Sequence, residues 1–261
     1  MDLRKEIGKY RIVSLILVRA GGSKPYRCFW KLCGKTLLEW GIRIVRDSEY
    51  IDDVVVSTED SRIKRAAERY GARVIDRPYF QTGKFPLDLA APPFNRQKPR
   101  SLIHQGQNVC LDSTLYSQAA MSNAFGIVAD VTAGGNVQCP LFTTKSVDRL
   151  IEKFFEDEEA WQANAVYPVP PKLWTVNPKI DRLFPIFHDT FQGLDRQSYP
   201  SLYRSAGNYS VGGCGRYMSS ESEKRHTYIV VKPEEGLHIH DEEDLALAEF
   251  YMQRRLKKER K

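Results

Sequence analysis

The sequence lacks the cysteine pattern of a disulfide framework or of a zinc site. Its five cysteines are an odd number in 261 residues, and no two of them stand in the closely spaced pairs that zinc sites use. They are Cys28, Cys33, Cys110, Cys139 and Cys214. Reduced thiols are typical of the cytosol, so we expect a cytoplasmic protein.

Long apolar runs are also missing. The longest, around residues 15–18, is far shorter than the roughly 20 residues that a transmembrane helix needs. The stretch from Met1 to Tyr10 is charged and contains no apolar core of a signal peptide. We therefore expect no membrane partner and no targeting segment.

Basic charge is not spread along the chain. There are 39 Lys and Arg against 33 Asp and Glu, which gives a net charge of +6. Residues 254–261 hold six basic residues and one acidic residue, or +5 of that total. A nucleic-acid-binding domain carries a basic stripe within its fold, whereas the rest of this chain is nearly neutral. We expect no nucleic-acid partner and predict that the basic tail is a solvated helix end.

What the sequence does contain is an alternation of strands and helices. The nearly continuous apolar run at 11–18 predicts a strand buried on both faces. Asp60 and Gly71 are typical of the start and the stop of a helix. Strands are predicted at 11–18, 53–57, 73–75, 126–132, 164–169 and 227–231, and helices at 36–48, 61–70, 113–124, 146–155 and 241–258. This order predicts an α/β fold with a mostly parallel sheet, helices on both faces and a ligand site at the carboxyl ends of the strands.

Two stretches interrupt this alternation. Residues 81–110 contain several prolines and basic side chains, and we interpret them as a long surface loop inserted in a single domain of residues 1–261. Residues 177–215 are rich in proline, glycine and aromatic residues, and we predict that they leave the main sheet as a small excursion. Homodimers often exchange such arms, so this stretch is the candidate dimerisation arm of a homodimer.

A glycine-rich loop with three cations follows the first predicted strand. It reads Arg19-Ala20-Gly21-Gly22-Ser23-Lys24-Pro25-Tyr26-Arg27. Glycines let backbone N–H groups approach a phosphate, and the cations Arg19, Lys24 and Arg27 neutralise it. Gly21 and Gly22 also suit a plain tight turn, but the three cations favour an anion site.

This loop and several later segments resemble a known family. The segments are 11–24, 34–40, 51–60, 70–78, 129–143, 196–207 and 237–249. They are similar, in order, to segments of the acylneuraminate cytidylyltransferases, also called CMP-sialic acid synthetases. No one motif decides the likeness, but the series runs over nearly the whole chain, with 81–110 as an insertion.

The resemblance implies an activity and a set of catalytic residues. It implies a Rossmann-like nucleotidyltransferase domain, a homodimer, and transfer of CMP from CTP to a 2-keto-3-deoxy sugar acid with Mg²⁺ and release of pyrophosphate. A sugar hydroxyl would attack the α-phosphate in line. The candidate catalytic residues, which stabilise the transferred charge, are Lys24, Arg27 and Arg19.

Other positions are candidates for binding the two substrates. An amide offers hydrogen bonds to a base or a sugar, and the carboxylate of a sugar acid needs a fixed cation and amide donors. The candidate nucleotide-binding residues are Ala20, Gly21, Gly22, Ser23, Asn136 and Gln138. The candidates for the acceptor are Lys172, Arg196 and Gln197.

The chain departs from the family in the loop and in the later motif. Ala20 stands where the family has an arginine, and Arg19 comes one residue earlier. A slip of one position along a strand end turns a side chain to the other face, so Arg19 binds phosphate only if the loop bulges. Phe142 also replaces an arginine, which leaves open a substrate other than sialic acid.

The closing segment departs most. His238 and His240 occupy the positions of the two aspartates that hold magnesium in the family, and imidazole is a poor ligand for this hard cation. Three alternatives stay open: a softer divalent metal on the two histidines, magnesium held by other carboxylates and the phosphates, or a site without metal. The histidines also fit two residues that share one strand face and have no catalytic role.

Two further functions remain open at this point. The chain is also interpretable as a nucleotidyltransferase for a different sugar or acid acceptor, or for another base. The two histidines are compatible with a third possibility, a paralogue that binds a nucleotide but has lost catalysis.

Overall fold

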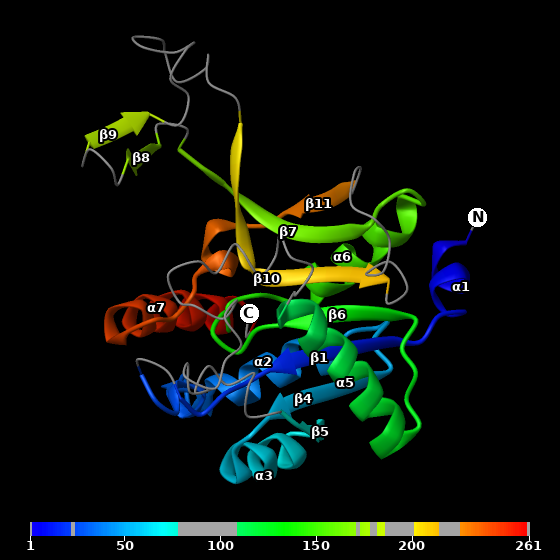
Figure 1. Ribbon diagram of the computed structural model, residues 1–261. Helices are drawn as coiled ribbons and strands as arrows, with labels where there is room; N and C mark the ends of the chain where they lie inside the picture. Colours follow the sequence, from blue (N-terminus) through cyan, green and yellow to red (C-terminus); the bar gives the residue numbers. More distant parts are fainter. Residues whose placement is uncertain are drawn as a thin grey trace.

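The computed structural model describes residues 2–21, 24–77, 109–170, 173–177, 182–185, 201–213 and 225–259 (Figure 1). Within these residues a seven-stranded main sheet contains β1 (Ile12–Leu17), β4 (Asp53–Thr58), β5 (Arg73–Asp76), β6 (Val131–Gly135), β7 (Gln162–Val169), β10 (Leu202–Gly213) and β11 (His226–Val230). Two small sheets pair β2 (Lys31–Leu32) with β3 (Lys35–Thr36), and β8 (Trp174–Asn177) with β9 (Arg182–Pro185).

The main sheet is mostly parallel, in the spatial order β11-β7-β10-β6-β1-β4-β5. β1 is parallel to β4 and β6, β4 is parallel to β5, and β11 is parallel to β7. β10 is antiparallel to both of its neighbours, β6 and β7. The chain leaves β1 on the side of β4 and β5 and returns on the other side as β6. The carboxyl ends of β1 and β6 therefore flank a topological switch point, where open α/β sheets bind ligands.

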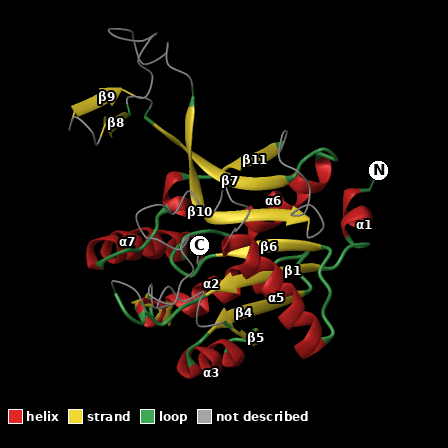
Figure 2. Cartoon of the chain, viewed as in Figure 1, coloured by secondary structure: helices red, strands yellow, loops and turns green. Residues whose placement is uncertain are grey.

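Helices cover both faces of this sheet (Figure 2). They are α1 (Leu3–Ile7), α2 (Leu37–Arg46), α3 (Ser61–Arg69), α5 (Val109–Phe125), α6 (Thr144–Glu156) and α7 (Glu242–Glu259), with 3-10 turns η1 (Arg27–Phe29) and η6 (Pro233–Gly236). Ile12 and Ile16 of β1 belong to the large core on the side of α2, α3 and α6. Val13 faces the other way and packs in a second core with Met121 of α5. This two-sided burial explains the continuous apolar run of the first strand and confirms the predicted α/β architecture.

The helix starts follow local sequence signals. Thr36 caps α2, because its hydroxyl accepts the N–H of Glu39 at 3.1 Å. Asp60 caps α3, as predicted, and accepts the N–H groups of Arg62 at 2.8 Å and Ile63 at 3.2 Å. Each cap satisfies donors that the first helical turn leaves without a partner.

A third, smaller core fixes the C-terminal part of the chain. Its buried residues come from β2, the start of α2, the segment before α6, the segment before α7, and α7 itself; they are Leu32, Leu37, Leu141, Ile239, Ala248 and Met252. Burying apolar area, at roughly 25 cal/mol per Å², holds α7 to β2 and to the start of α2. As a result the segment at 237–240 lies beside residues that are far away in the sequence.

One predicted strand is wrong in position. The sequence predicts a strand at 126–132, whereas β6 runs from Val131 to Gly135. Gly126 has a φ of 65° just after α5 ends, and the carboxylate of Asp130 accepts the N–H of Arg11 at 2.8 Å. Gly134 and Gly135 disfavour a strand locally, but in the fold they pair with Leu15 and Ile16 of β1.

The predicted excursion at 177–215 is wrong in its last part. β10, at Leu202–Gly213, lies inside the main sheet between β7 and β6. The β8–β9 hairpin does stand apart, beyond the far ends of β7 and β10 (Figure 1). The predicted insertion at 81–110 lies outside the described residues except for its last two, which begin α5. Its role, and the role of the arm in dimerisation, stay predictions.

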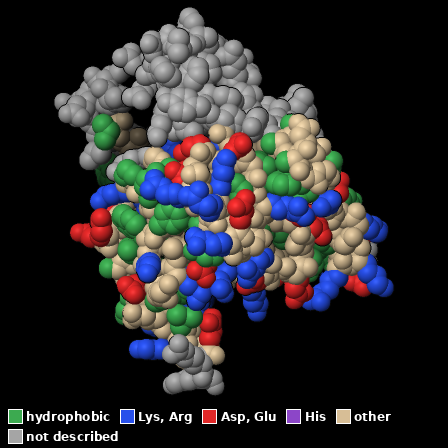
Figure 3. Space-filling view, turned by 90° about the horizontal axis from the view of Figure 1, so that it is seen from below, with side chains coloured by type: hydrophobic (Ala, Val, Ile, Leu, Met, Phe, Trp, Pro, Cys, Tyr) green, Lys and Arg blue, Asp and Glu red, His purple; other side chains and the backbone are tan. Residues whose placement is uncertain are grey.

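The described surface adds two observations. Among the described residues, none of the helices combines the length and the apolar character that crossing a bilayer requires. Figure 3 shows one face of the molecule, on which Lys and Arg side chains are scattered among acidic, polar and apolar ones.

Candidate functional site

The glycine-rich loop lies at the switch point of the sheet. The N–H of Val18 still bonds the carbonyl of Ser57 on β4 at 3.0 Å, and the carbonyl of Ala20 accepts the N–H of Tyr26 at 3.0 Å. The loop therefore closes on itself directly beyond the carboxyl end of β1. Ala20 is buried, with 7% exposure, while Arg19 is exposed. The in–out alternation of the strand thus continues past its end, and Arg19 faces away from the core.

Two cations of the loop contact the segment before α7. The ammonium group of Lys24 lies 3.1 Å from both carboxylate oxygens of Glu242, in the first turn of α7. The Nη1 atom of Arg27 donates to the carbonyl of Ile239 at 3.1 Å. These contacts hold the two predicted catalytic cations beside the histidine segment.

His238 and His240 lie together in that segment. Their rings stack with centroids 4.2 Å apart, and the N–H of Ile239 between them bonds the carbonyl of Gln138 at 2.9 Å. The Nδ1 atom of His238 is buried and has no hydrogen-bond partner among the described residues. Burial, then the nearby His240 and Arg27, lower the pKa of His238 to about 4. His238 is therefore neutral at pH 7.

The low pKa of His238 predicts a pH dependence of stability. Between its folded pKa of about 4 and its ordinary value of 6.5, the unfolded chain binds a proton that the folded chain does not. The free energy of unfolding must therefore fall as the pH drops through this window. We expect His238→Asn to flatten the dependence, as measured by urea denaturation at about pH 7 and about pH 4.5. Equal slopes in the two proteins would contradict the assignment.

The turn after β6 is built around Asn136. Its Oδ1 accepts the N–H of Gln138 at 2.8 Å, and its Nδ2 donates to the carbonyl of Gly207 at 2.7 Å. The Oδ1 of Asn136 therefore fixes its own turn, and the Nδ2 joins this turn to β10. Phe142 and Tyr209 stack in the core with ring centroids 3.8 Å apart, so the position of Phe142 is buried in this chain.

A family pattern runs through these elements. The sequence pattern of the family described as cytidylyltransferase matches residues 23–167, which is more than half of the chain. The chain belongs to the cytidylyltransferase family. The matched residues begin in the glycine-rich loop and include the turn at Asn136.

Two curated relatives are similar to parts of this chain. The chain is 35% identical over 72 residues to the N-acylneuraminate cytidylyltransferase of Oncorhynchus mykiss, which is 27% of this chain and 17% of the relative. It is 24% identical over 162 residues to the 3-deoxy-manno-octulosonate cytidylyltransferase of Bdellovibrio bacteriovorus, which is 61% of this chain and 52% of the relative. The matches thus span about half of one relative and under a fifth of the other.

Solved structures share its fold. A CMP:2-keto-3-deoxy-manno-octonic acid synthetase complexed with CTP superposes with a TM-score of 0.61 at 13% identity, covering 94% of this chain and 99% of that one. The 4-diphosphocytidyl-2C-methyl-D-erythritol synthase of Anaerococcus prevotii gives 0.59 at 12% identity, covering 95% and 99%. At such low identity the likeness shows the fold alone, and it confirms the Rossmann-like prediction.

The described residues of the chain do not make a magnesium site from protein ligands. Within the described part of the chain, no three His, Cys, Asp or Glu side chains gather as a metal centre requires. Near His238 and His240, Asp244 accepts the N–H of His240 at 2.8 Å, and Asp241 accepts the N–H of Asp244 at 2.9 Å. Imidazole nitrogens suit softer metals than magnesium. The two histidines do not fit Mg²⁺, and a divalent metal stays a prediction.

Three residues at this edge were missed by the sequence analysis. Glu59 follows β4 and accepts the N–H of Ala20 at 2.9 Å. Arg77 follows β5, and its pKa is lowered by burial against the opposing effect of Glu59. Arg204, from β10, contributes to the low pKa of His238. A position directly after a predicted strand is a signal for Glu59 and Arg77, whereas Arg204 had none, because the place of β10 in the sheet is not encoded locally.

The predicted site residues divide into those outside the described residues and those that the structure brings together. Five of them lie outside the described residues: Gly22, Ser23, Lys172, Arg196 and Gln197. Of the others, the structure brings together Lys24, Arg27, His238 and His240 at the carboxyl edge of β1. The turn that contains Asn136 and Gln138 joins them through the bond between Ile239 and Gln138.

Proposed function

We propose that this chain transfers CMP from CTP to an acidic 2-keto-3-deoxy sugar, with release of pyrophosphate. One observation carries the proposal: the glycine-rich loop lies at the topological switch point, and its Lys24 and Arg27 contact a segment more than 200 residues away. Backbone N–H groups and cations at such a place suit a polyphosphate. Membership of the cytidylyltransferase family supports CTP as the nucleotide.

Each cation has a distinct role in this proposal. Lys24 is exposed and paired with an exposed carboxylate, and such pairs are weak, so a triphosphate displaces Glu242 and takes the ammonium group. Arg27 is part-buried and anchored on Ile239, so it stays in place as charge moves onto the leaving pyrophosphate. Arg19, exposed at the same edge, adds to this field. The protein acts by positioning and electrostatic stabilisation.

The acceptor is an acid in this proposal because two arginines lie close enough to His238 to act on its charge. Arg27 and Arg204 both act on His238, and a carboxylate is the complementary partner of such a group. The two relatives named above act on sialic acid and on 3-deoxy-manno-octulosonate according to their names, and either acid is a starting substrate. Lys172, Arg196 and Gln197 remain the proposed additional contacts for the carboxylate.

A divalent metal, a homodimer and a cytoplasmic location complete the proposal. When bound, Mg²⁺ would neutralise phosphate charge. Its ligands would be mainly phosphate oxygens of CTP, because His238 and His240 do not fit this ion. The homodimer would use the predicted arm at 177–215; Trp174, in β8 just before it, is 61% exposed.

A screen for pyrophosphate release tests this function. It crosses CTP, ATP, GTP and UTP with several 2-keto-3-deoxy sugar acids and with Mg²⁺, Mn²⁺ and Zn²⁺. We expect release with CTP and one class of keto sugar acid, and a product that contains CMP linked to the sugar. Pyrophosphate release only with another nucleotide, or only with a sugar phosphate that has no carboxylate, would contradict the proposal. It would favour a nucleotidyltransferase for a different acceptor or base.

The histidine pair favours one second candidate. A chain in which His238 and His240 replace metal-binding side chains is compatible with a nucleotide-binding paralogue without turnover. That candidate predicts CTP binding by calorimetry together with no pyrophosphate release under any metal and acceptor in the screen. Turnover above background with a single combination excludes it.

A further inference from the structure

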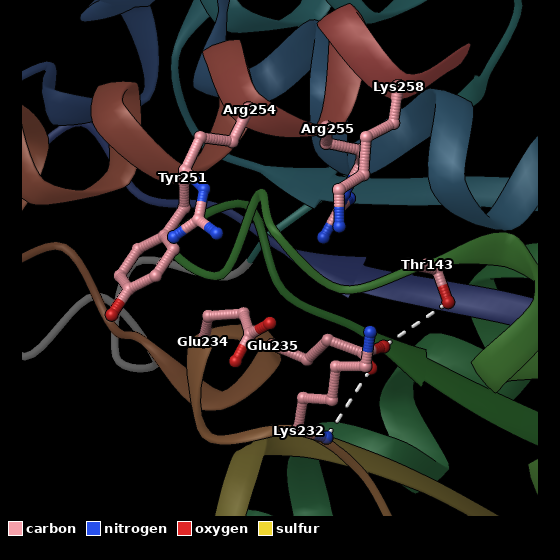
Figure 4. A pocket seen from close by; sticks show the side chains of 8 residues that line it. All are labelled: Thr143, Lys232, Glu234, Glu235, Tyr251, Arg254, Arg255 and Lys258. Atoms are coloured by element: carbon pink, nitrogen blue, oxygen red, sulfur yellow. Dashed lines mark hydrogen bonds between the residues drawn. The ribbon is translucent and has the colours of Figure 1, made fainter. Parts of the chain in front are cut away.

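A second cationic site lies at the other end of α7 from the candidate active site. A pocket of about 190 Å³ lies between η6 and the last turns of α7 (Figure 4). Its lining residues are Thr143, Lys232, Glu234, Glu235, Tyr251, Arg254, Arg255 and Lys258. Arg254 follows Glu242 by twelve residues in an unbroken helix, which places it about 18 Å along the axis from the contact with Lys24.

The carboxylates of the pocket do not neutralise its four cations. Glu235 is buried, and its Oε2 accepts the hydroxyls of Ser146 at 2.6 Å and Thr143 at 3.2 Å. Thr143 is the N-cap of α6, so the charge of Glu235 serves the positive end of that helix. Glu235 also acts on the charge of Arg255, as do Glu234 and Glu259. The lining of the pocket still holds four cations, Lys232, Arg254, Arg255 and Lys258, against the two carboxylates Glu234 and Glu235.

The cations themselves have few partners. Among the described residues, none of Lys232, Arg254 and Lys258 forms a salt bridge with a carboxylate. Arg255 donates to the carbonyl of Leu141, and burial lowers its pKa. Figure 4 shows the guanidinium group of Arg254 directed from α7 toward the turn of Glu234.

Ordinary helix capping does not account for this arrangement. Cations near the C-terminal end of a helix interact favourably with its dipole. Lys257 interacts with the dipole of α7 in the same way as the cations that line the pocket. Lys257 does not line the pocket, however, whereas Lys232 comes from a different element and joins the cations of α7 there. Like charges gathered in a concave site repel each other unless an anion lies between them.

We propose that this pocket binds a phosphate or diphosphate group. Two arginines offer forked donors that match phosphate oxygens, and two lysines add point charges. The volume of about 190 Å³ is below the roughly 300 Å³ at which pockets for drug-sized ligands begin, so the bound group is compact. The site is separate from the glycine-rich loop and does not depend on the proposed transfer of CMP.

The test is calorimetric titration with inorganic pyrophosphate in a Lys24→Met background, which weakens the loop site. We expect binding to persist there and to weaken about tenfold or more when Arg254→Gln and Lys258→Gln are added. Lys257→Gln, on the same turn but outside the pocket, should leave the affinity unchanged. Thermal melting followed by circular dichroism checks that each variant is folded.

Further titrations identify the source of the phosphate. Inorganic phosphate, pyrophosphate and CTP are compared in the same background. Tighter binding of pyrophosphate than of CTP indicates that the ligand is a free diphosphate, and the reverse order indicates a nucleotide. Either result supports the site if the Arg254 and Lys258 substitutions weaken the binding. The proposal is overturned if the Lys24→Met protein binds none of the three, or binds them equally well with and without the Arg254 and Lys258 substitutions.

Discussion

Lys24→Met is expected to lower the rate of pyrophosphate release about 100- to 1000-fold. Removing one preorganised donor to the charge that develops in the transition state has an effect of this size. The ammonium group lies beyond the carboxyl end of β1, and its described partner is the exposed carboxylate of Glu242. The folded state should hardly change, because this pair lies at the surface. The measurement is steady-state pyrophosphate release with CTP and the acceptor found in the screen.

The matched control for this prediction is Lys31→Met. Lys31 is also exposed, but it lies on β2, outside the glycine-rich loop of residues 19–27. We expect it to keep the wild-type rate. A Lys24→Met enzyme as active as the Lys31→Met enzyme would remove the loop from the mechanism and leave the proposed function without its central observation.

Gly207→Ala is expected to lower the free energy of unfolding by roughly 3 kcal/mol. Gly207 has a φ of 65° within β10, and a Cβ there would lie 2.3 Å from the Sγ of Cys139. Cys139 is fully buried and cannot move away without disturbing the core. The added methyl group therefore combines backbone strain with overpacking. Urea denaturation measures the loss.

Gly126→Ala separates the two contributions. Gly126 has the same φ of 65°, but nothing lies within 4 Å of a Cβ built on it. It should therefore show the strain alone, about 1–2 kcal/mol. If the two variants lose the same stability, the contact between Gly207 and Cys139 is not tight. Since Asn136 donates to the carbonyl of Gly207, Gly207→Ala should also weaken CTP binding, whereas Gly126→Ala should not.

Local patterns carried most of the fold prediction. The apolar run of β1 and the cap at Asp60 both appear in the structure where the sequence predicted them. Each depends on neighbours within one strand or one helical turn. Prediction failed where pairing overrides propensity, as in β6, whose glycines form a strand because β1 lies beside them. It failed again for β10, a glycine-rich segment that long-range pairing places inside the sheet.

The candidate site divides in the same way. The glycine-rich loop and its cations were visible in the sequence, because residues that follow a buried strand lie at the ligand-binding edge of a parallel sheet. The contact of Lys24 with Glu242 was not, because it joins residues 218 positions apart. Nor could the sequence distinguish a charged His238 from a neutral one, since burial is the main cause of its low pKa.

By itself the sequence determined most of the strands and helices, and with them the edge of the sheet at which the glycine-rich loop lies. Periodicity, caps and glycines encode these features over a few residues. Only the tertiary structure decided which distant segments meet: β10 between β6 and β7, the histidine segment beside Arg27, and four cations around one pocket. These long-range contacts follow from burial and strand pairing over the whole chain, and no local stretch of residues encodes them.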